Sequence, residues 1–368
     1  MLYHLLYPLR DVISFFNIFR YVNFRSIFAM ITALVISFVL GPIIIKGLKR
    51  CNIVDSANED RPETHQKKAG TPIMGGVIIL LAIVSATLLW ADFKNGYVQV
   101  VLFSVIWMSA VGFADDYLKV TKKRNGLIES YKWIGSILLG LIVGLGLYFK
   151  YQQNNQVLES TFMPFFKNLT ITLPVWIYLP LVVVLISLAV HSVNLTDGLD
   201  GLAAGLSAIA FITYAVFTYV FSHSNWSRYF DVIYLPGCDE LTIFCFAVSG
   251  ACIGFLWFNV TPAMIFMGDV GSLALGGALA VVAVLTKTEI LLGIIGAVFA
   301  GDALSALIQR IWFKITRKRT GKGRRIFLCA PIHHHFEKKG WSEPTIVVRF
   351  WIVGIFFALL SLSLLKIR

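Results

Sequence analysis

Residues 26–45 read SIFAMITALVISFVLGPIII, a run of 20 residues without a charged side chain. A helix of about 20 apolar residues is long enough to cross the hydrocarbon core of a bilayer. A removable signal peptide is not expected here, because the run is long enough to span the membrane and basic residues follow it. The run therefore predicts a membrane span, and the fold class depends on how often such runs recur.

Similar apolar runs recur along the whole chain of 368 residues, which is 57% hydrophobic and only 14% charged. This composition excludes a soluble protein with one core and indicates a membrane protein with many spans. We predict an all-α integral membrane protein, a single polytopic domain over residues 1–368 with about ten transmembrane helices. The predicted spans are residues 25–48, 72–91, 97–114, 131–149, 173–192, 198–221, 239–259, 267–285, 290–313 and 345–365.

Lysine and arginine gather in three of the connecting loops, 49–71, 117–132 and 314–344, and are sparse in the loops between them. An excess of these residues marks the loops that stay in the cytoplasm. An even number of spans then places both termini on the outer, periplasmic side. The cytoplasmic loops are expected near residues 49–71, 115–132, 192–200, 259–271 and 314–344.

Five aspartates fall at one predicted level, the cytoplasmic ends of the spans. Asp115 and Asp116 lie in GFADDYLKV, Asp197 and Asp200 in HSVNLTDGLDGLA, and Asp269 in FMGDVGS. A carboxylate within a span costs on the order of 2.5–3.5 kcal/mol at the helix centre, so its placement is informative. Each acid alone could be a helix cap or an interfacial charge, but five at one level indicate a shared site.

The helix ends around these acids suit a phosphate ligand. Asp197, Asp200 and Asp269 are expected near helix N-termini, where free backbone N–H groups and the helix dipole favour anions. The two acids of GFADDYLKV instead end a predicted helix, so they need compensation from a metal ion or from Lys119 one turn later. Mg²⁺ binds carboxylates together with phosphate oxygens. The residues therefore predict a magnesium-bound phosphate, with the active site at the cytoplasmic face.

The stretch APIHHHFEKKGW, residues 330–341, carries three adjacent histidines, His333, His334 and His335. A purification tag is not expected inside a chain. A shared zinc ion is disfavoured, because neighbouring residues of a helix point about 100° apart. From the residues alone, a solvated loop and a phosphate-binding role both stay open, since imidazole donates hydrogen bonds in either charge state.

Several motifs together resemble those of a known family. HQKKAGTPIMGG, GFADDYLKVTKKRNGL, VNLTDGLDGLA, LWFNVTPAMIFMGDVGSLALGG and APIHHHFEKKGWSEPTIVVRFW look like the successive signatures of the bacterial phospho-N-acetylmuramoyl-pentapeptide transferases. The Asp-Asp and Asn-x-x-Asp-Gly-x-Asp-Gly motifs resemble those of the wider superfamily of polyprenyl-phosphate sugar-1-phosphate transferases. The triple-histidine stretch is specific to the muramoyl-pentapeptide branch. The likeness covers nearly the whole chain.

The resemblance implies a ten-span, homodimeric enzyme of the bacterial cell (inner) membrane. Such an enzyme transfers phospho-N-acetylmuramoyl-pentapeptide from its UDP carrier to undecaprenyl phosphate. The products are lipid I and UMP, the cofactor is Mg²⁺, and the reaction is the first membrane step of peptidoglycan synthesis. The expected partners are these two substrates, membrane lipid and a second copy of the chain, with no nucleic acid.

The resemblance also implies roles for the residues at matching positions. The catalytic residues are expected to be Asp115, Asp116, Asp269, His333 and His334, with Asp269 as the Mg²⁺ ligand. The substrate contacts are expected to be Lys68, Lys119, Lys132, Asn194, Asp197, Asp200, Asn259 and His335. Two positions depart from the family pattern: Ile73 stands where threonine is expected, and Asp302 where glutamate is expected. Family contacts at those two positions are therefore not carried over.

Two mechanisms and two other functions stay open on the sequence alone. The lipid phosphate could attack the donor directly, or a covalent phospho-enzyme could form on Asp115 or Asp116. The donor could be UDP-N-acetylglucosamine, as in another branch of the superfamily. A secondary transporter would also explain many spans and intramembrane acids, but its site would lie near the membrane midplane rather than at one face.

Overall fold

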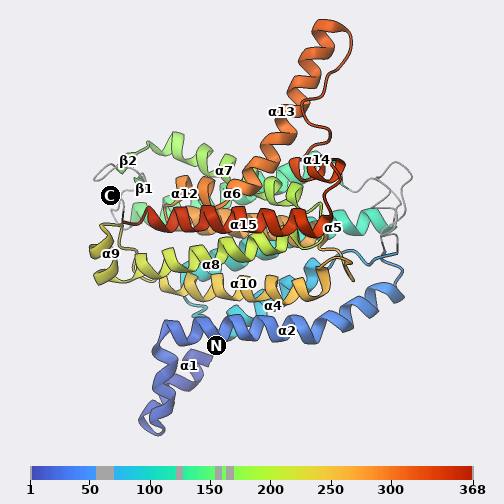
Figure 1. Ribbon diagram of the computed structural model, residues 1–368. Helices are drawn as coiled ribbons and strands as arrows, with labels where there is room; N and C mark the ends of the chain where they lie inside the picture. The colour runs from blue at the N-terminus through green and yellow to red at the C-terminus, as the bar shows by residue number, and fades with distance from the viewer. Residues whose placement is uncertain (1, 55–69, 122–126, 154–159, 163–169, 367–368) are drawn as a thin grey trace.

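The computed structural model describes residues 2–54, 70–121, 127–153, 160–162 and 170–366, and these residues are almost entirely helical (Figure 1). Eight of the described helices are long and apolar enough to cross a membrane. They are α2 (Val22–Arg50), α5 (Gly96–Thr121), α6 (Glu129–Gln153), α7 (Val175–Thr196), α8 (Leu202–Ser222), α10 (Asp239–Asn259), α11 (Gly268–Leu285) and α15 (Glu343–Ser363). The prediction of an all-α membrane fold is confirmed at this level.

The remaining two predicted spans, residues 72–91 and 290–313, correspond to apolar segments that are not single long helices. The helix α4 (Gly76–Trp90) has 15 residues, which at 1.5 Å per residue is about 22 Å and shorter than the hydrocarbon core of about 30 Å. The helices α12 (Glu289–Ile295) and α13 (Ala297–Thr320) pass the test for a span only when they are taken together. Eight helices, or nine with this pair, thus have the length and composition of a span.

The predicted span 290–313 is wrong as a single straight helix. The structure breaks it at Gly296, and α12 and α13 are bent by 81°. Gly296 takes φ −89° and ψ 16°, which ends α12 outside the helical region. Glycine is one of the usual causes of a sharp kink, because it adds no side chain that would hold the turn. Most of α13 therefore leaves the direction of the other spans (Figure 1).

The helix α11 is the centre of the bundle, because every residue from Asp269 to Leu285 is buried. Two glycines on neighbouring helices let their backbones approach its first turn. A Cβ added to Gly76 of α4 would lie 2.1 Å from the backbone nitrogen of Gly271, and one added to Gly112 of α5 would lie 2.2 Å from the carbonyl oxygen of Asp269. The start of α11 is thus held between α4 and α5.

Short elements lie at the two ends of the bundle. A small antiparallel pair, β1 (Ser160–Phe162) and β2 (Thr170–Thr172), and the helix α9 (Ser224–Phe230) lie at one end. This pair and the isolated bridge between Val54 and Pro72 are the β-structure among the described residues. The helix α14 (Ile332–Lys338) lies at the opposite end (Figure 1).

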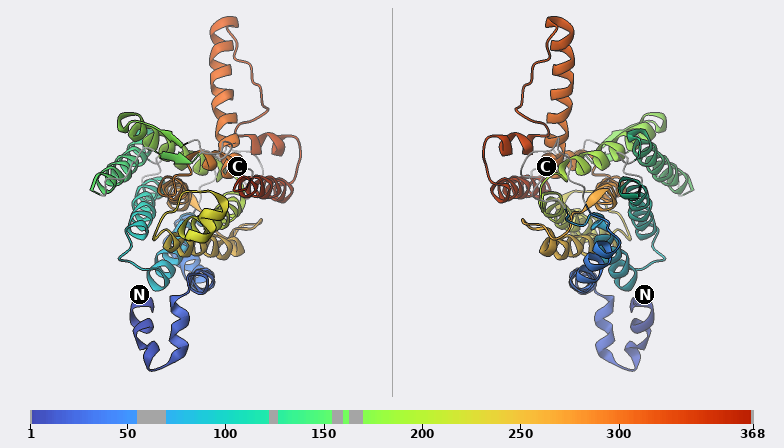
Figure 2. Two further views of the ribbon diagram at one scale, coloured as in Figure 1. Left: turned by 90° about the vertical axis from the view of Figure 1, so that its left-hand side faces the viewer. Right: turned by 90° about the vertical axis from the view of Figure 1, so that its right-hand side faces the viewer.

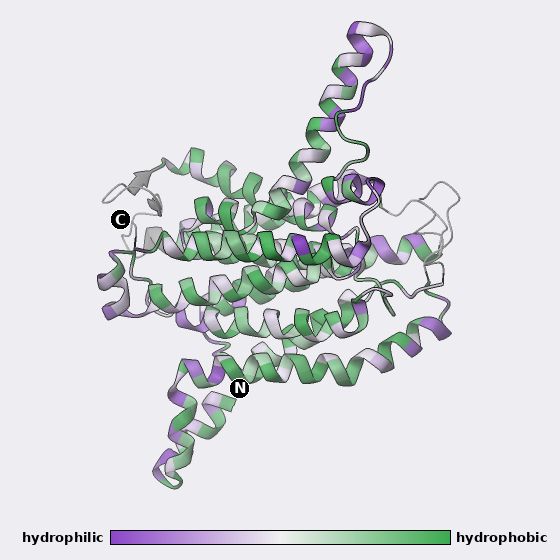
Figure 3. Cartoon of the chain, viewed as in Figure 1, coloured by the Kyte–Doolittle hydropathy of each residue, from purple (hydrophilic) through white to green (hydrophobic). Residues whose placement is uncertain are grey.

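Two arms extend sideways from the bundle in opposite directions, as Figure 2 shows. One is the N-terminal segment of α1 (Leu2–Leu6), η1 (Tyr7–Asp11) and η2 (Ser14–Arg20), and the other is α13. The hydropathy colouring is apolar along the long helices and hydrophilic toward their ends (Figure 3). This pattern is the one expected for helices whose middle parts contact lipid.

Candidate active site

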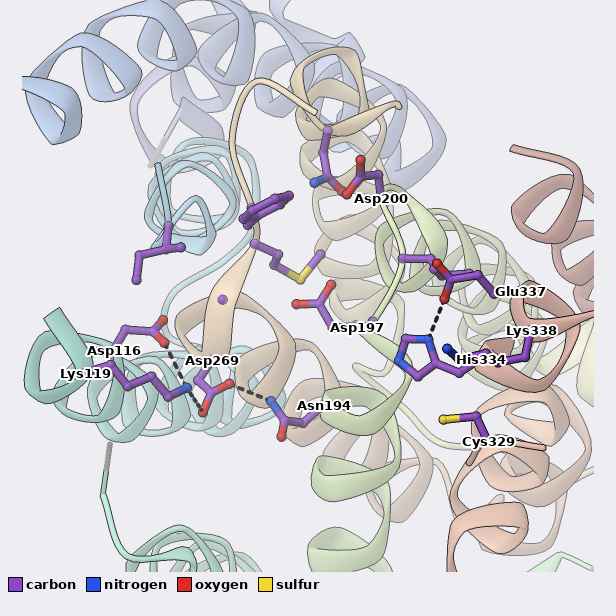
Figure 4. A pocket seen from close by; sticks show the side chains of 17 residues that line it. Asp116, Lys119, Asn194, Asp197, Asp200, Asp269, Cys329, His334, Glu337 and Lys338 are labelled. Atoms are coloured by element: carbon purple, nitrogen blue, oxygen red, sulfur yellow. Dashed lines mark hydrogen bonds and ion pairs between the residues drawn. The ribbon is translucent and has the colours of Figure 1, made fainter. Parts of the chain in front are cut away.

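A cavity of about 490 Å³ opens at the end of the bundle that carries α14 (Figure 4). The end of α5, the turn between α7 and α8, the start of α11 and the segment around α14 form its walls. Eight of the predicted site residues line it: Asp116, Lys119, Asn194, Asp197, Asp200, Asn259, Asp269 and His334. These residues come from segments far apart in the sequence, and packing alone brings them together.

Three carboxylates form the most concentrated group of charge in this site. One oxygen from each of Asp115, Asp116 and Asp269 lies within 4.8 Å of the others. Asp115 is completely buried, while Asp116 and Asp269 keep a small exposed surface that faces the cavity. The N–H of Leu127 donates to Asp115 Oδ1 at 2.7 Å, which fixes the deepest member of the group.

Two lysines neutralise much of the charge of these carboxylates. Lys119 Nζ lies 2.6 Å from Asp115 Oδ2 and 3.3 Å from Asp269 Oδ2. Lys132 Nζ lies 2.9 Å from Asp115 Oδ2 and also contacts Asp269 Oδ2. Lys119 follows Asp115 by four positions on α5, so both side chains share one face of that helix. The compensation predicted for Lys119 is confirmed, and Lys132 adds to it.

The N-terminus of α11 completes this wall of the cavity. The N–H of Val270, in the first turn of α11, donates to Asp116 Oδ2 at 3.2 Å. The side-chain amide of Asn194 donates to Asp269 Oδ1 at 2.9 Å and to Ser272 Oγ at 2.8 Å. Free N–H groups at a helix N-terminus favour anions. The wall therefore combines fixed hydrogen-bond donors with carboxylates, as phosphate and metal sites require.

Asp197 directly follows α7 and lies between the carboxylate group and His334 (Figure 4). Removal of the carboxyl from water, together with the nearby carboxylates of Asp269 and Asp116, raises the pKa of Asp197 to about 8. A carboxyl with such a pKa is partly protonated near neutral pH. It can therefore donate a hydrogen bond to a phosphate oxygen as well as accept one.

Replacement of Asp197 by asparagine is expected to raise the melting temperature of the ligand-free, Mg²⁺-free protein more at about pH 8.5 than at about pH 5.5. The pKa of Asp197 is higher in the folded chain than the ordinary value of 3.8, so folding retains a proton that the unfolded chain loses. The stability from this group is present below about pH 4 and is lost as the pH rises toward about 8. Asparagine removes this loss.

Thermal unfolding in detergent at both pH values measures this effect. Asp239→Asn is the matched control, since Asp239 starts α10 and is not among the residues that line the cavity. An equal gain for Asp197→Asn at both pH values would contradict the prediction.

The turn between α7 and α8 is held from two sides. The N–H of Asp200 donates to Glu343 Oε1 at 2.7 Å, and Asp200 Oδ2 accepts from the N–H of Ala263 at 3.3 Å. Glu343 was not predicted as a site residue. The one feature of the sequence that could have indicated its role is its position shortly after the triple-histidine motif. The start of α15 thus positions the turn that carries Asp197.

Both polar atoms of the Asn259 side-chain amide form hydrogen bonds with backbone groups. Its Oδ1 accepts from the N–H of Gly201 at 2.9 Å, and its Nδ2 donates to the carbonyl oxygen of Ile265 at 2.9 Å. Gly201 has φ +83°, a conformation that glycine adopts without strain. Asn259 therefore ties the α7–α8 turn to the segment before α11, and its contact with substrate stays a prediction.

The three histidines have three different environments. His333 is completely buried, and its Nδ1 donates to Asp302 Oδ2 at 2.6 Å. His334 lines the cavity, with its Nδ1 2.9 Å from Glu337 Oε2. His335 points away and accepts from the N–H of Leu328 through Nδ1 at 3.1 Å. Among the described residues, His334 is the histidine that faces the cavity.

His333 connects the site to the bent helix α13. Asp302, one of the two departures from the family pattern, also accepts from the N–H of His333 at 3.3 Å and is itself buried. The other ring nitrogen, Nε2, has no hydrogen-bond partner among the described residues and packs against Gly198, where an added Cβ would lie 2.4 Å away. Asp302 thus fixes the ring orientation of His333 against the turn that carries Asp197.

Replacement of His333 or His334 by alanine is expected to lower turnover more than replacement of His335. His333→Ala and His334→Ala should differ in their free energy of unfolding. His333→Ala leaves the buried Asp302 without its partner and is expected to cost about 3–5 kcal/mol of unfolding free energy. His334→Ala should leave the melting temperature within a few degrees of the parent, because its ring is partly exposed.

Turnover and thermal unfolding of the three alanine variants, prepared in parallel, provide the measurement. His335→Ala serves as the matched control from the same helix. Equal loss of turnover in all three variants would contradict the assignment.

The remaining predicted residues lie outside the cavity wall or outside the described part of the chain. Asp115, Lys132, His333 and His335 do not line the cavity, although the first two belong to the charge cluster behind it. Lys68 lies outside the described residues. Ile73, the other departure from the family pattern, does line the cavity. Three lining residues with ionisable side chains were not predicted: Cys329, Glu337 and Lys338.

The donor set of the carboxylate group fits a magnesium ion. Mg²⁺ prefers oxygen ligands and is bound in proteins by one or two carboxylates together with phosphate oxygens and water. Asp116 and Asp269 both reach the cavity and could hold the ion, whereas Asp115 is enclosed behind them. Asp116 is therefore a second candidate ligand beside the predicted Asp269.

The fold and this site together define a class, a multi-span membrane protein with a carboxylate-rich cavity at one end of its bundle. The family model described as glycosyl transferase family 4 matches residues 98–287. Proteins of Desulfosudis oleivorans and Thermodesulfovibrio yellowstonii are 50% and 47% identical to this chain, each over 100% of both chains. A protein of Gemmatimonas aurantiaca is 47% identical over the same shares. All three carry the name phospho-N-acetylmuramoyl-pentapeptide-transferase. The chain belongs to the phospho-N-acetylmuramoyl-pentapeptide-transferase family.

Proposed function

We propose that this chain transfers phospho-N-acetylmuramoyl-pentapeptide from its UDP carrier to undecaprenyl phosphate, with lipid I and UMP as products. Family membership over the full length supports this reaction. The main structural support for this reaction is one wall of the cavity. There Asp116, Asp269 and Lys119 lie beside the N-terminus of α11. Phosphoryl transfer needs mainly such positioning and charge neutralisation.

The reaction proceeds by a single in-line displacement. An oxygen of the lipid phosphate forms a bond with the β-phosphorus of the donor, and the bond from that phosphorus to the bridging oxygen breaks. The bridging oxygen stays with the α-phosphate and leaves as UMP. A phosphate monoester has a second pKa near 6 and is largely a dianion at neutral pH, so no strong general base is required.

The residues of the chain position and neutralise the reacting phosphates. Asp116 faces the cavity and orients the attacking lipid phosphate, while Asp115 behind it holds Lys119 and Lys132 in place. His334, from the opposite wall, donates a hydrogen bond to the leaving UMP (Figure 4). Asp269 and Asp116 would hold Mg²⁺, and the ion would supply positive charge to neutralise the diphosphate.

The alternative route forms a covalent phospho-sugar on Asp115 or Asp116. Burial of Asp115 behind the cavity wall disfavours it as a nucleophile. Incubation with donor labelled in its β-phosphate, without acceptor lipid, tests this route. Label that stays on the denatured protein would overturn the single displacement.

The orientation and assembly of the protein form part of the proposal. We place the cavity at the cytoplasmic face of the bacterial cell membrane and both termini outside. The number of spans reaches ten when the α12–α13 pair and α4 are each counted as one span. Lys49 and Arg50 in the last turn of α2 and Lys119 in the last turn of α5 support this orientation. A homodimer is proposed from the family resemblance. Cysteine accessibility from each side of sealed vesicles tests the orientation, with Cys51 as an exposed native thiol near the cavity end of α2.

The reaction is tested by UMP release from purified protein in detergent. We expect release only when UDP-N-acetylmuramoyl-pentapeptide, undecaprenyl phosphate and Mg²⁺ are all present, and none in EDTA. Release with UDP-N-acetylglucosamine as donor instead would assign the chain to the other branch of the superfamily. Flux of substrate into liposomes without Mg²⁺, and without UMP release, would favour a transporter.

A further inference from the structure

The outer half of α13 and the segment that returns from it, residues 308–328, form an arm that projects from the bundle; we call it the basic arm. The 81° bend at Gly296 turns α13 away from the direction of the spans. Figure 1 shows α13 rising sideways, with its tip displaced toward the end of the bundle that carries α14. The arm therefore slants away from the spans and toward the membrane surface at that end of the bundle.

The basic arm is a folded unit and has one of its faces covered. Gln309 Oε1 accepts from the N–H groups of Ile326 and Phe327 at 2.9 Å and 3.0 Å, and Gln309 Nε2 donates to the carbonyl oxygen of Phe327 at 3.0 Å. The N–H of Arg324 donates to Thr316 Oγ1 at 2.8 Å. The returning segment therefore packs along the Gln309 and Thr316 side of the helix and leaves two faces open.

One open face is apolar. Ile308, Ile311, Trp312 and Ile315 follow the i, i+3, i+4, i+7 spacing of one helix face, and they are between 39% and 48% exposed. The same face continues toward the bundle through Leu304, which is 53% exposed. The apolar face of the arm is thus continuous with the part of α13 nearest the bundle.

The other open face and the tip are strongly basic. The exposed cations of the arm are Arg310, Lys314, Arg317, Lys318, Arg319, Lys322, Arg324 and Arg325. No aspartate or glutamate occurs between Asp302 and Glu337. None of these cations faces the cavity described above, so the proposed reaction does not account for them.

We infer that the basic arm is a binding surface for anionic phospholipid headgroups, held at the membrane surface with its apolar face in the lipid. A helix with one apolar and one basic face lies in the interface in this way. Clusters of four to eight lysines and arginines attract anionic lipid. A second copy of the arm is a poor partner, because two surfaces of the same charge repel. The inference does not depend on the proposed reaction.

Native mass spectrometry of the full chain in detergent tests this inference by counting bound phosphatidylglycerol and phosphatidylcholine. The variant R317Q/K318Q/R319Q removes three cations from the arm. The matched control K46Q/K49Q/R50Q removes three exposed cations from the cavity end of α2. The variant R317K/R319K keeps the charge. Melting temperature and elution volume establish that each variant is folded.

We expect the arm variant to weaken the tightest phosphatidylglycerol binding at least tenfold and to leave phosphatidylcholine binding unchanged. The control and the charge-conserving variant should each change it less than twofold. Phosphatidylglycerol binding that survives neutralisation of the arm would overturn the inference, even if the arm were then found to bind RNA or an acidic protein. Equal losses in the arm variant and the α2 control would also overturn it, because net charge alone would then explain the preference.

Discussion

Replacement of Asp269 by alanine is expected to lower the rate of UMP release by a factor on the order of 1,000. This carboxylate contacts Lys119, Lys132 and Asn194 at once and lies in the first turn of the central helix α11. Its loss removes a candidate Mg²⁺ ligand and takes away one acceptor from each of these three side chains. Removal of one preorganised electrostatic group at a reacting centre typically costs about 10²–10³ in rate.

The measurement is turnover of Asp269→Ala as a function of Mg²⁺ concentration. Asp239→Ala is the matched control, because Asp239 also lies in the first turn of a buried span helix but not at the cavity. The control should keep turnover within twofold of the parent. A loss below tenfold in folded Asp269→Ala would show that this carboxylate does not act on the reacting phosphates.

Replacement of Gly112 by alanine is expected to lower turnover about 100-fold although it adds a single methyl group. The new Cβ would lie 2.2 Å from the carbonyl oxygen of Asp269, which is backbone and has no room to move aside. The start of α11 must therefore shift relative to Asp115 and Asp116, which lie one turn after Gly112 on α5. A displacement of about 1 Å at a reacting centre can cost 10²-fold.

Gly146→Ala provides the matched control for this prediction, since a Cβ at Gly146 of α6 meets nothing within 4 Å. It should keep full turnover and should not lower the melting temperature, because alanine favours a helix interior over glycine. Full turnover in Gly112→Ala would mean that the close approach of α5 and α11 is not needed for the site.

The sequence located eight of the ten predicted spans, because hydrophobic length is a local property. The predicted span 239–259 coincides with α10, and the start of α11 differs from its prediction by one residue. The motif around Asp269 also placed this acid at the start of a helix, as the structure shows. The expectation for three other acids is wrong. Asp197 caps the C-terminus of α7 rather than a helix N-terminus, and Asp115 and Asp116 lie inside α5, which continues to Thr121.

The tertiary structure decided which of these residues meet and which face the cavity. Lys119 and Asp269 are 150 positions apart, and the contact between them depends on the close packing of α5 against α11. The sequence alone does not distinguish the environments of the three adjacent histidines. In the structure, His333 pairs with the buried Asp302, whereas His334 faces the cavity. The bend at Gly296 could not be predicted from the sequence either, because several other glycines lie inside helices without breaking them. Local patterns fix where a helix forms, but side-chain contacts between distant segments depend on how those helices pack.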